Sequence, residues 1–235
     1  KQNFILIVIF LIHFTLSATP RLPQVFGDNM VLQRGMPIPV WGWADKNEKI
    51  TLHINHQTKS VTADNNGKWR INFDKEAAGG PYQLVVEGKE TITFNNVLVG
   101  EVWICSGQSN MEMPIAGWGK IKNYEQEIKE ANYPKIHVLT VVRETASKPK
   151  DDIAPAEWKV CSPETAGDFT AVGYFFAREL YNKLKVPVGL INTSWCGTMG
   201  ETWISREAFE NSDEFKSMIS QMKVLNLDSL TKQRT

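Results

Sequence analysis

The sequence predicts an α/β fold preceded by an all-β, sandwich-like domain, with the division near residue 96. Between residues 20 and 96, short alternating or apolar stretches are separated by turn residues, a pattern typical of antiparallel sandwiches. Between residues 97 and 235, longer apolar stretches alternate with helical patterns. Strands that are apolar on both faces and alternate with helices indicate a parallel sheet.

Composition excludes several classes of protein. The chain has 235 residues, of which 42% are hydrophobic and 22% charged, as in ordinary folded domains. Its 26 Lys and Arg residues balance 26 Asp and Glu residues. Because this leaves no excess of positive charge, we do not expect nucleic acid as a partner.

The N-terminus predicts export. An apolar run from Phe4 to Ile12 continues past His13 to Leu16, and the small residues Ser17 and Ala18 follow. The alternative is a membrane anchor, but a spanning helix needs roughly 20 apolar residues. We therefore interpret residues 1–18 as a signal peptide, which predicts a secreted or periplasmic protein with no membrane association after cleavage.

Cysteine usage does not predict a metal site. Cys105, Cys161 and Cys196 show no C-x-x-C spacing, so we expect no structural metal. Their odd number means that at least one is free or pairs between chains. The default expectation is buried thiols that pack as small apolar side chains.

Seven short strands are expected in the first domain. They are Met30–Gln33, Ile38–Trp43, Lys49–Ile54, Lys59–Thr62, Trp69–Phe73, Tyr82–Glu87 and Thr91–Phe94, with Gly, Asn, Asp or Pro in the turns between them. Trp41, Trp43 and Trp69 could form a sugar-binding face. The alternative, which we favour, is that they pack in the core or against the next domain.

The second domain is expected to have three parallel strands, Val97–Ile104, Ile136–Val142 and Val188–Ile191, with helices at Tyr124–Ala131 and Val172–Leu184. In the second helix the apolar residues Val172, Phe175, Phe176, Leu180 and Leu184 share one face. A doubly wound sheet usually has about five strands. Because the segment from Ser205 to Thr235 looks helical and then polar, we expect the sheet in this chain to be incomplete.

A candidate nucleophile follows the first parallel strand. The chain passes from Ile104 and Cys105 through Ser106-Gly107-Gln108 to Ser109, the strand-to-turn arrangement that presents a nucleophilic serine at a helix N-terminus. There the free N–H groups and the helix dipole favour an oxyanion. Ser109 is preferred to Ser106 because Gly107 precedes it by two residues. Met111 stands where G-x-S-x-G has its second glycine, so a structural serine in a glycine turn remains an alternative.

Three stretches resemble one family. The sequence W-I-C-S-G-Q-S-N-M at Trp103–Met111 resembles the signature of the sialate O-acetylesterase family, which belongs to the SGNH-type serine esterases. Phe169–Ala177 and Gly189–Thr198 are similar to the helix and to the strand and loop that follow in that family. The resemblance implies an SGNH-hydrolase-like α/β fold and removal of acetyl groups from O-acetylated sialic acids, or secondly from acetylated plant polysaccharide, without a cofactor.

The resemblance also assigns site residues. It implies Ser109 as nucleophile and as one oxyanion N–H donor, and Gly197 as a second donor, although a plain turn glycine is the alternative at Gly197. Cys196 occupies a position where the family usually has glycine. The oxyanion Asn and the Asp and His of the triad match nothing after Thr198, so we expect them downstream of this chain.

No general base is predicted within the chain. His13 lies in the signal peptide, and His53, His56 and His137 are expected to be structural. We interpret Glu112 and Glu201 as anchoring or capping groups. The alternative function is therefore a non-catalytic, secreted carbohydrate-binding fragment or module. The oligomeric state is left open.

Overall fold

The computed structural model describes residues 20–119, 121–146 and 149–222. The predicted signal peptide, residues 1–18, lies outside these residues. The strands are β1 Val31–Gln33, β2 Ile38–Trp43, β3 Lys49–Ile54, β4 Gln57–Thr62, β5 Lys68–Phe73, β6 Gly79–Glu87, β7 Thr91–Cys105, β8 Tyr133–Thr140, β9 Trp158–Cys161 and β10 Val188–Asn192. The helices are α1 Ser109–Glu112, α2 Tyr124–Glu130, α3 Ala171–Leu184, α4 Arg206–Glu210 and α5 Lys216–Met222, with 3₁₀ turns at Ala166–Asp168, Gly200–Trp203 and Asp213–Phe215.

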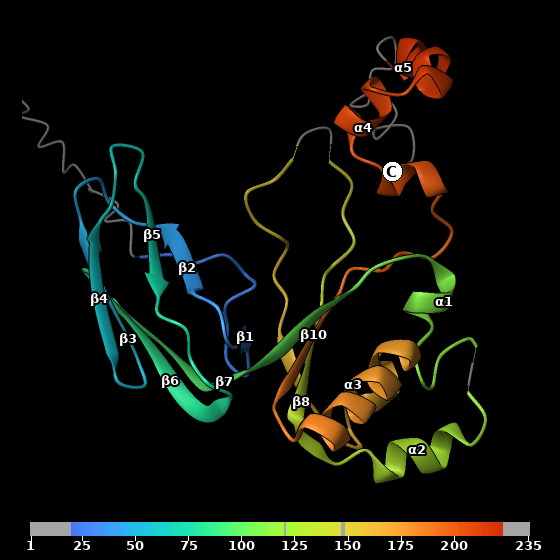
Figure 1. The fold of residues 1–235 in the computed structure, drawn as a ribbon, viewed down its shortest axis with the longest axis horizontal. Coiled ribbons are helices and arrows are strands. Elements are labelled where there is room, and N and C mark those ends of the chain that lie inside the picture. Colours follow the sequence, from blue (N-terminus) through green and yellow to red (C-terminus); the bar gives the residue numbers. More distant parts are fainter. Residues whose placement is uncertain (1–19, 120, 147–148, 223–235) are drawn as a thin grey trace, which may run out of the picture.

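Two sheets occupy the N-terminal part (Figure 1). Strands β4, β3, β6 and β7 are antiparallel neighbours, and β1 pairs in parallel with β7. Strands β2 and β5 form a separate antiparallel pair. Buried side chains of both sheets join one apolar cluster, for example Val40 of β2 and Leu52 of β3. The alternation of buried and exposed residues along β5 follows from its apolar residues at every second position.

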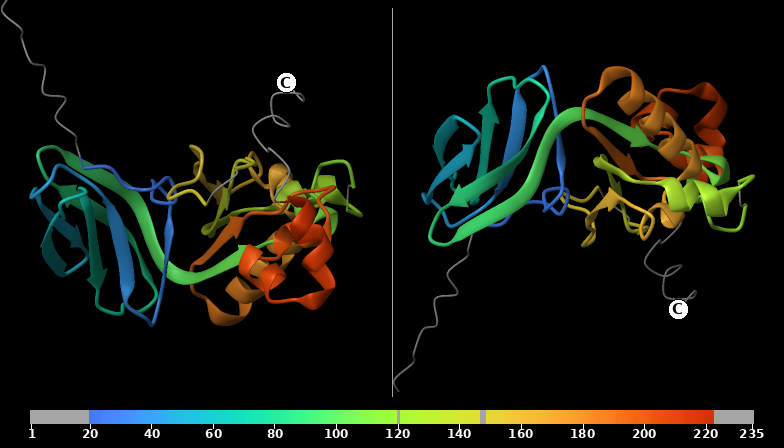
Figure 2. Two further views of the ribbon diagram at one scale, coloured as in Figure 1. Left: turned by 90° about the horizontal axis from the view of Figure 1, so that it is seen from above. Right: turned by 90° about the horizontal axis from the view of Figure 1, so that it is seen from below.

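A single strand crosses the predicted domain division. The strands expected at Thr91–Phe94 and Val97–Ile104 are one strand, β7, because Asn95 and Asn96 do not end it. Asn96 has a φ of +53°, a backbone conformation that asparagine tolerates. Its amide Nδ2 donates to Asn29 Oδ1 at 2.8 Å, so the irregularity is stabilised inside the strand. Figure 2 shows β7 running from the first sheet into the second part of the chain. A separate all-β domain over residues 20–96 stays a prediction.

The second part is a mixed α/β structure, as expected. Strand β10 lies between β7 and β8 and is parallel to both, which confirms the predicted parallel strands. A fourth strand, β9, pairs antiparallel with β8 and was not predicted. It has only four residues, of which Trp158 and Cys161 are buried, too short a pattern to separate from a loop by periodicity.

Helix α3 packs on the sheet with only part of the predicted apolar face: Phe175 and Leu180 pack against the core, and small residues supply the rest of the contact. Val172, Phe176 and Leu184 are 40–47% exposed, whereas the buried residues are Ala171, Gly173, Tyr174 and Ala177. The small residues allow the helix to approach β10 closely. A Cβ at Gly173 would lie 3.0 Å from Cys105 Sγ and 3.1 Å from Leu190 Cδ1. Hydrophobic periodicity predicted the helix correctly. It counts large apolar side chains, so it did not indicate that the small residues Ala171, Gly173 and Ala177 would be buried.

None of the helices in the described ranges is long and apolar enough to cross a membrane.

Candidate active site

The carboxyl ends of the three parallel strands meet at one edge of the sheet. In register, Asn192 of β10 lies opposite Cys105 of β7 and Thr140 of β8. Thr193 N–H donates to Cys105 O at 2.9 Å, and Val141 N–H donates to Asn192 O at 2.9 Å. Ligand sites of parallel sheets lie at this edge. The turn that holds Ser109 begins directly beyond it.

Gly107 turns the chain toward Ser109. Its φ of +146° is one that residues with a Cβ rarely adopt. Its carbonyl accepts a hydrogen bond from Trp195 N–H at 2.9 Å, which ties the turn to the segment after β10. Ser109 begins α1 and is half-buried, whereas Ser106 is exposed. The structure thus places the two serines differently, with Ser109 facing the segment after β10.

Helix α1, which Ser109 begins, is short. It has four residues, Ser109–Glu112, a single turn. Because the dipole of a helix sums over aligned peptide units, one turn contributes little of it. No described residue accepts a hydrogen bond from the N–H of Ser109 or of Gly197.

The loop after β10 lies against Ser109. The thiol of Cys196 donates to Ser109 Oγ, with Sγ and Oγ 3.4 Å apart. Gly197, the next residue, has a φ of +75° and open space where a Cβ would be. This left-handed conformation favours glycine. Ser109 and Gly197, the two site residues suggested by resemblance, therefore lie on segments in direct contact.

Glu112 anchors this loop. Its Oε2 accepts a hydrogen bond from Cys196 N–H, and its Oε1 lies 2.9 Å from Nη1 of Arg143, beyond β8. The Glu112 side chain is only 15% exposed. The interpretation of Glu112 as an anchoring group is thus confirmed, although the sequence did not reveal its partners. On the other side, Gln108 Nε2 donates to Thr198 O.

Thr170 is a further residue that sequence reasoning missed. Its side chain is fully buried, and its Oγ1 donates to Met111 O and accepts from Gly173 N–H at 3.3 Å. The second bond is an N-cap of α3 and the first joins that cap to α1. Thr170 lies in the stretch that resembles the family's helix, but only the fold brings that helix to the serine turn.

The three described histidines form their hydrogen bonds and ion pairs with residues other than Ser109. His137 is fully buried between the carbonyl oxygens of Asn29 and Pro134. Burial lowers the pKa of His137, while the two carbonyl groups act in the opposite direction. His53 pairs with Thr58 and Glu87, and His56 lies 3.6 Å from Glu76. The structural role predicted for these three histidines agrees with their partners.

The thiols fall into two classes. All three are free, but Cys105 and Cys161 are buried and Cys196 is exposed. Burial raises the pKa of both buried thiols, for Cys161 to about 12. The expectation of buried thiols is therefore correct for Cys105 and Cys161 and wrong for Cys196, because Cys196 follows the strand into an exposed loop.

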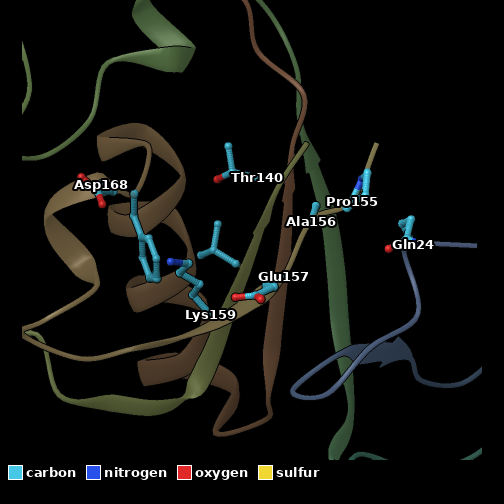
Figure 3. Close-up of a pocket in the computed structure, with 9 residues that line it drawn as sticks. Gln24, Thr140, Pro155, Ala156, Glu157, Lys159 and Asp168 are labelled. Atoms are coloured by element: carbon cyan, nitrogen blue, oxygen red, sulfur yellow. The ribbon is translucent and has the colours of Figure 1, made fainter. Parts of the chain in front are cut away.

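Metal ligands do not gather around the serine turn: within residues 20–119, 121–146 and 149–222, no group of three His, Cys, Asp or Glu side chains could hold a metal ion. A cavity of about 550 Å³ lies between β8, β9 and the segment before α3 (Figure 3). Its lining includes Glu157, Lys159 and Asp168 but neither Ser109 nor the loop that contacts it. This cavity is therefore separate from the candidate nucleophile.

Comparison with known proteins identifies the family. The family of sialic acid-specific acetylesterases, which are carbohydrate esterases, matches residues 99–231, more than half of the chain. The chain belongs to this family. The matched part of the sequence contains the serine turn, β8, α3, β10 and the Gly197 loop.

Relatives of this acetylesterase family agree with the assignment. Sialate O-acetylesterases from Rattus norvegicus and Mus musculus are 31% and 29% identical over 210 residues, 81% of this chain. The crystal structure of a carbohydrate acetylesterase from Xanthomonas citri is 37% identical and covers 84% of this chain with a TM-score of 0.79. The chain spans 38% of the length of these two mammalian relatives and 45% of the Xanthomonas chain.

Proposed function

We propose that the complete protein hydrolyses O-acetyl esters on sialic acids or related acetylated sugars, and that Ser109 is its nucleophile. The observation that best supports this proposal is the contact between Ser109 Oγ and the loop of Gly197, at the carboxyl edge of the parallel strands. Membership in the acetylesterase family supports the reaction class and the acetylated substrate. Within that class, this turn does not distinguish one sugar alcohol from another.

The reaction is an acyl transfer in two steps. Ser109 Oγ attacks the acetyl carbonyl carbon while a general base removes its proton, and the N–H groups of Ser109 and Gly197 donate to the oxyanion. Collapse of the tetrahedral intermediate breaks the ester bond, and the sugar oxygen receives the proton. Water then attacks the acetyl-enzyme by the same route and releases acetate.

The general base belongs to another part of the protein in this proposal. The three described histidines make their contacts elsewhere, and a base must reach the serine at hydrogen-bond distance. We therefore assign the catalytic His and Asp, and an additional oxyanion Asn, to residues outside 20–222. No metal or cofactor takes part in these steps.

The test measures acetate release by the complete protein. The substrates are an O-acetylated sialoside and an acetylated xylan, and the variants are Ser109→Ala and the matched control Ser106→Ala. Removal of a serine nucleophile costs about 10⁴–10⁶-fold in kcat, while the control should stay near the parent. Equal rates for the two variants would refute Ser109, and turnover of xylan alone would refute the sialic acid substrate.

One observation favours a second function, non-catalytic sugar binding: no described residue supplies a base to Ser109. A complete protein that releases no acetate from either substrate, but binds acetylated sugars, would establish this alternative. A complete protein with turnover that depends on Ser109 would exclude it.

The proposal includes export of the protein from the cytoplasm. The apolar run ending in Ser17 and Ala18 supports export and cleavage near Ala18. N-terminal sequencing of exported protein tests this. A mature chain that begins near Thr19 is expected, and an exported chain that still begins at residue 1 would contradict it.

A further inference from the structure

A second cavity, distinct from the serine turn, is rich in tryptophan. It has a volume of about 340 Å³, within the range of small-molecule sites, about 300–1,000 Å³. It lies at β2 and β5, which Figure 1 labels, and Asp151 of the loop that joins β8 to β9 also lines it. The lining residues are Trp41, Gly42, Trp43, Asp64, Lys68, Trp69, Arg70 and Asp151.

The three indoles have different roles. Trp69 alternates into the core and is 4% exposed, as the core interpretation of these residues predicted. Trp41 and Trp43 occupy the other face of β2 and are half-buried. Their cross-strand partners are Arg70 and Lys68. The fold thus brings two accessible indoles and two cations onto one face of the β2–β5 pair.

Neighbouring side chains hold both accessible rings in place. The Arg21 guanidinium lies 3.9 Å from the centroid of the Trp43 ring, and Arg21 is itself bound by Asp152 at 3.0 Å. Phe26 packs edge-on against Trp41, with the ring centroids 4.9 Å apart. Rings held in one orientation lose little conformational entropy when a ligand stacks on them.

The charged groups of the lining balance. Lys68 pairs with Asp151 at 3.3 Å, and Arg70 and Asp64 supply one further charge of each sign. Asp64 Oδ1 accepts from the N–H groups of Asn66 and Lys68, and no described residue bonds to its Oδ2. The cavity therefore offers both donors and acceptors but no net charge with which to attract an anion.

We propose that this cavity binds an uncharged pyranose ring of a glycan. Indole rings match the apolar C–H face of a pyranose, and the carboxylate and cationic groups match its hydroxyls as hydrogen-bond partners. A sialic acid, which is an anion, fits less well because the charges of the lining already balance. The expected occupant is thus a neutral sugar unit of the glycan, not the sugar unit that carries the acetyl group.

One loop, between β8 and β9, contacts both the cavity and the serine turn. Arg143, which pairs with Glu112, precedes Asp151 by eight residues, and eight residues span at most about 28 Å. A glycan of several sugar units is long enough to reach between the two sites. This link to the ester rests on the proposed function, whereas sugar binding in the cavity does not.

Sugar binding is tested with the complete protein by saturation-transfer NMR and calorimetry. The probes are methyl β-galactopyranoside and lactose, with adenine as an aromatic, non-sugar competitor for stacking. A Kd in the millimolar range is expected for a site that holds one ring. Trp41→Ala and Trp43→Ala should each weaken binding at least fivefold. Trp118→Ala, which removes a 63% exposed indole outside the cavity, should leave it unchanged.

Two milder variants distinguish a loss of sugar binding from a loss of folding. Arg70→Ala and Asp64→Asn alter only exposed positions and should weaken binding with the unfolding transition retained. Absence of sugar binding by the folded parent at about 20 mM, binding that all these variants retain, or tighter binding of adenine would overturn the proposal. Acetate release that depends on Ser109 without sugar binding would refute the cavity alone and leave the proposed function intact.

Discussion

Glu112→Ala is expected to lower kcat without unfolding the protein. The carboxylate of Glu112 accepts from Cys196 N–H, directly before Gly197, and is itself held by Arg143 at 2.9 Å. Removal of the carboxylate therefore frees the backbone that the proposal uses as an oxyanion donor. Because the oxyanion forms only on the reaction path, substrate binding should change little.

The magnitude follows from the lost hydrogen bond. A hydrogen bond to a charged group contributes about 1.5–3 kcal/mol, which corresponds to about 10- to 150-fold in rate. Loss of one oxyanion donor costs about 10²–10³-fold, which sets the upper limit. We expect kcat to fall about 10- to 100-fold, with KM within about twofold of the parent.

Steady-state acetate release by the complete protein is the assay. Glu112→Gln keeps an acceptor for Cys196 N–H but loses the charge that pairs with Arg143, so its kcat should recover to within about tenfold of the parent. Glu179→Ala removes a 63% exposed glutamate of α3 and serves as the matched control. A Glu112→Ala enzyme with kcat within about twofold of the parent, or with a raised KM alone, would refute the reasoning.

Three further outcomes are expected. Iodoacetamide should modify the exposed Cys196 before the buried Cys105 and Cys161. This modification should block acetate release, because Cys196 Sγ lies 3.4 Å from Ser109 Oγ. The Cys196→Ser variant should keep its activity after the same treatment, and full activity of the modified parent would contradict the prediction. Burial lowers the pKa of His137, so this imidazole binds a proton more readily in the unfolded chain than in the folded one. The free energy of unfolding should therefore fall as the pH drops below about 6.5, by at most ~1.4 kcal/mol per pH unit. Urea unfolding at pH 7.5 and 5.5 measures this, and a slope identical to that of His137→Gln would disprove it. The 235-residue chain alone should release acetate far more slowly than the Rattus norvegicus relative; a rate within about tenfold, ~1.4 kcal/mol in barrier, would show that the chain contains a base.

Local patterns predicted most of the elements. Alternation located β2, β3 and β5 within a residue of their observed ends, and turn residues separated them correctly. The errors arose where context outweighs local pattern. Asn95 and Asn96 look like a turn, yet a side-chain bond to Asn29 keeps β7 continuous. Small residues placed α3 on the sheet, a packing effect that hydrophobic periodicity underweights.

The sequence indicated which kind of site to expect, but not the side-chain contacts that support it. The strand-to-turn pattern predicted Ser109 and the resemblance added Gly197 as candidates, and the fold places their segments in contact. The supporting groups, Glu112 with Arg143 and Thr170 with Met111, join positions 31 and 59 residues apart along the chain. One sequence gives no signal for such pairs, because their partners are defined only by the arrangement of β7, β8 and α3.

Covalent labelling tests the assignment of Ser109 as nucleophile most directly. The complete protein is inactivated with a fluorophosphonate, digested, and mapped by mass spectrometry. The account predicts a single adduct on the peptide that contains Ser109, formed in step with the loss of acetate release, and no adduct in the Ser109→Ala variant. Full inactivation with the adduct on Ser106, on Cys196 or outside this turn would contradict it.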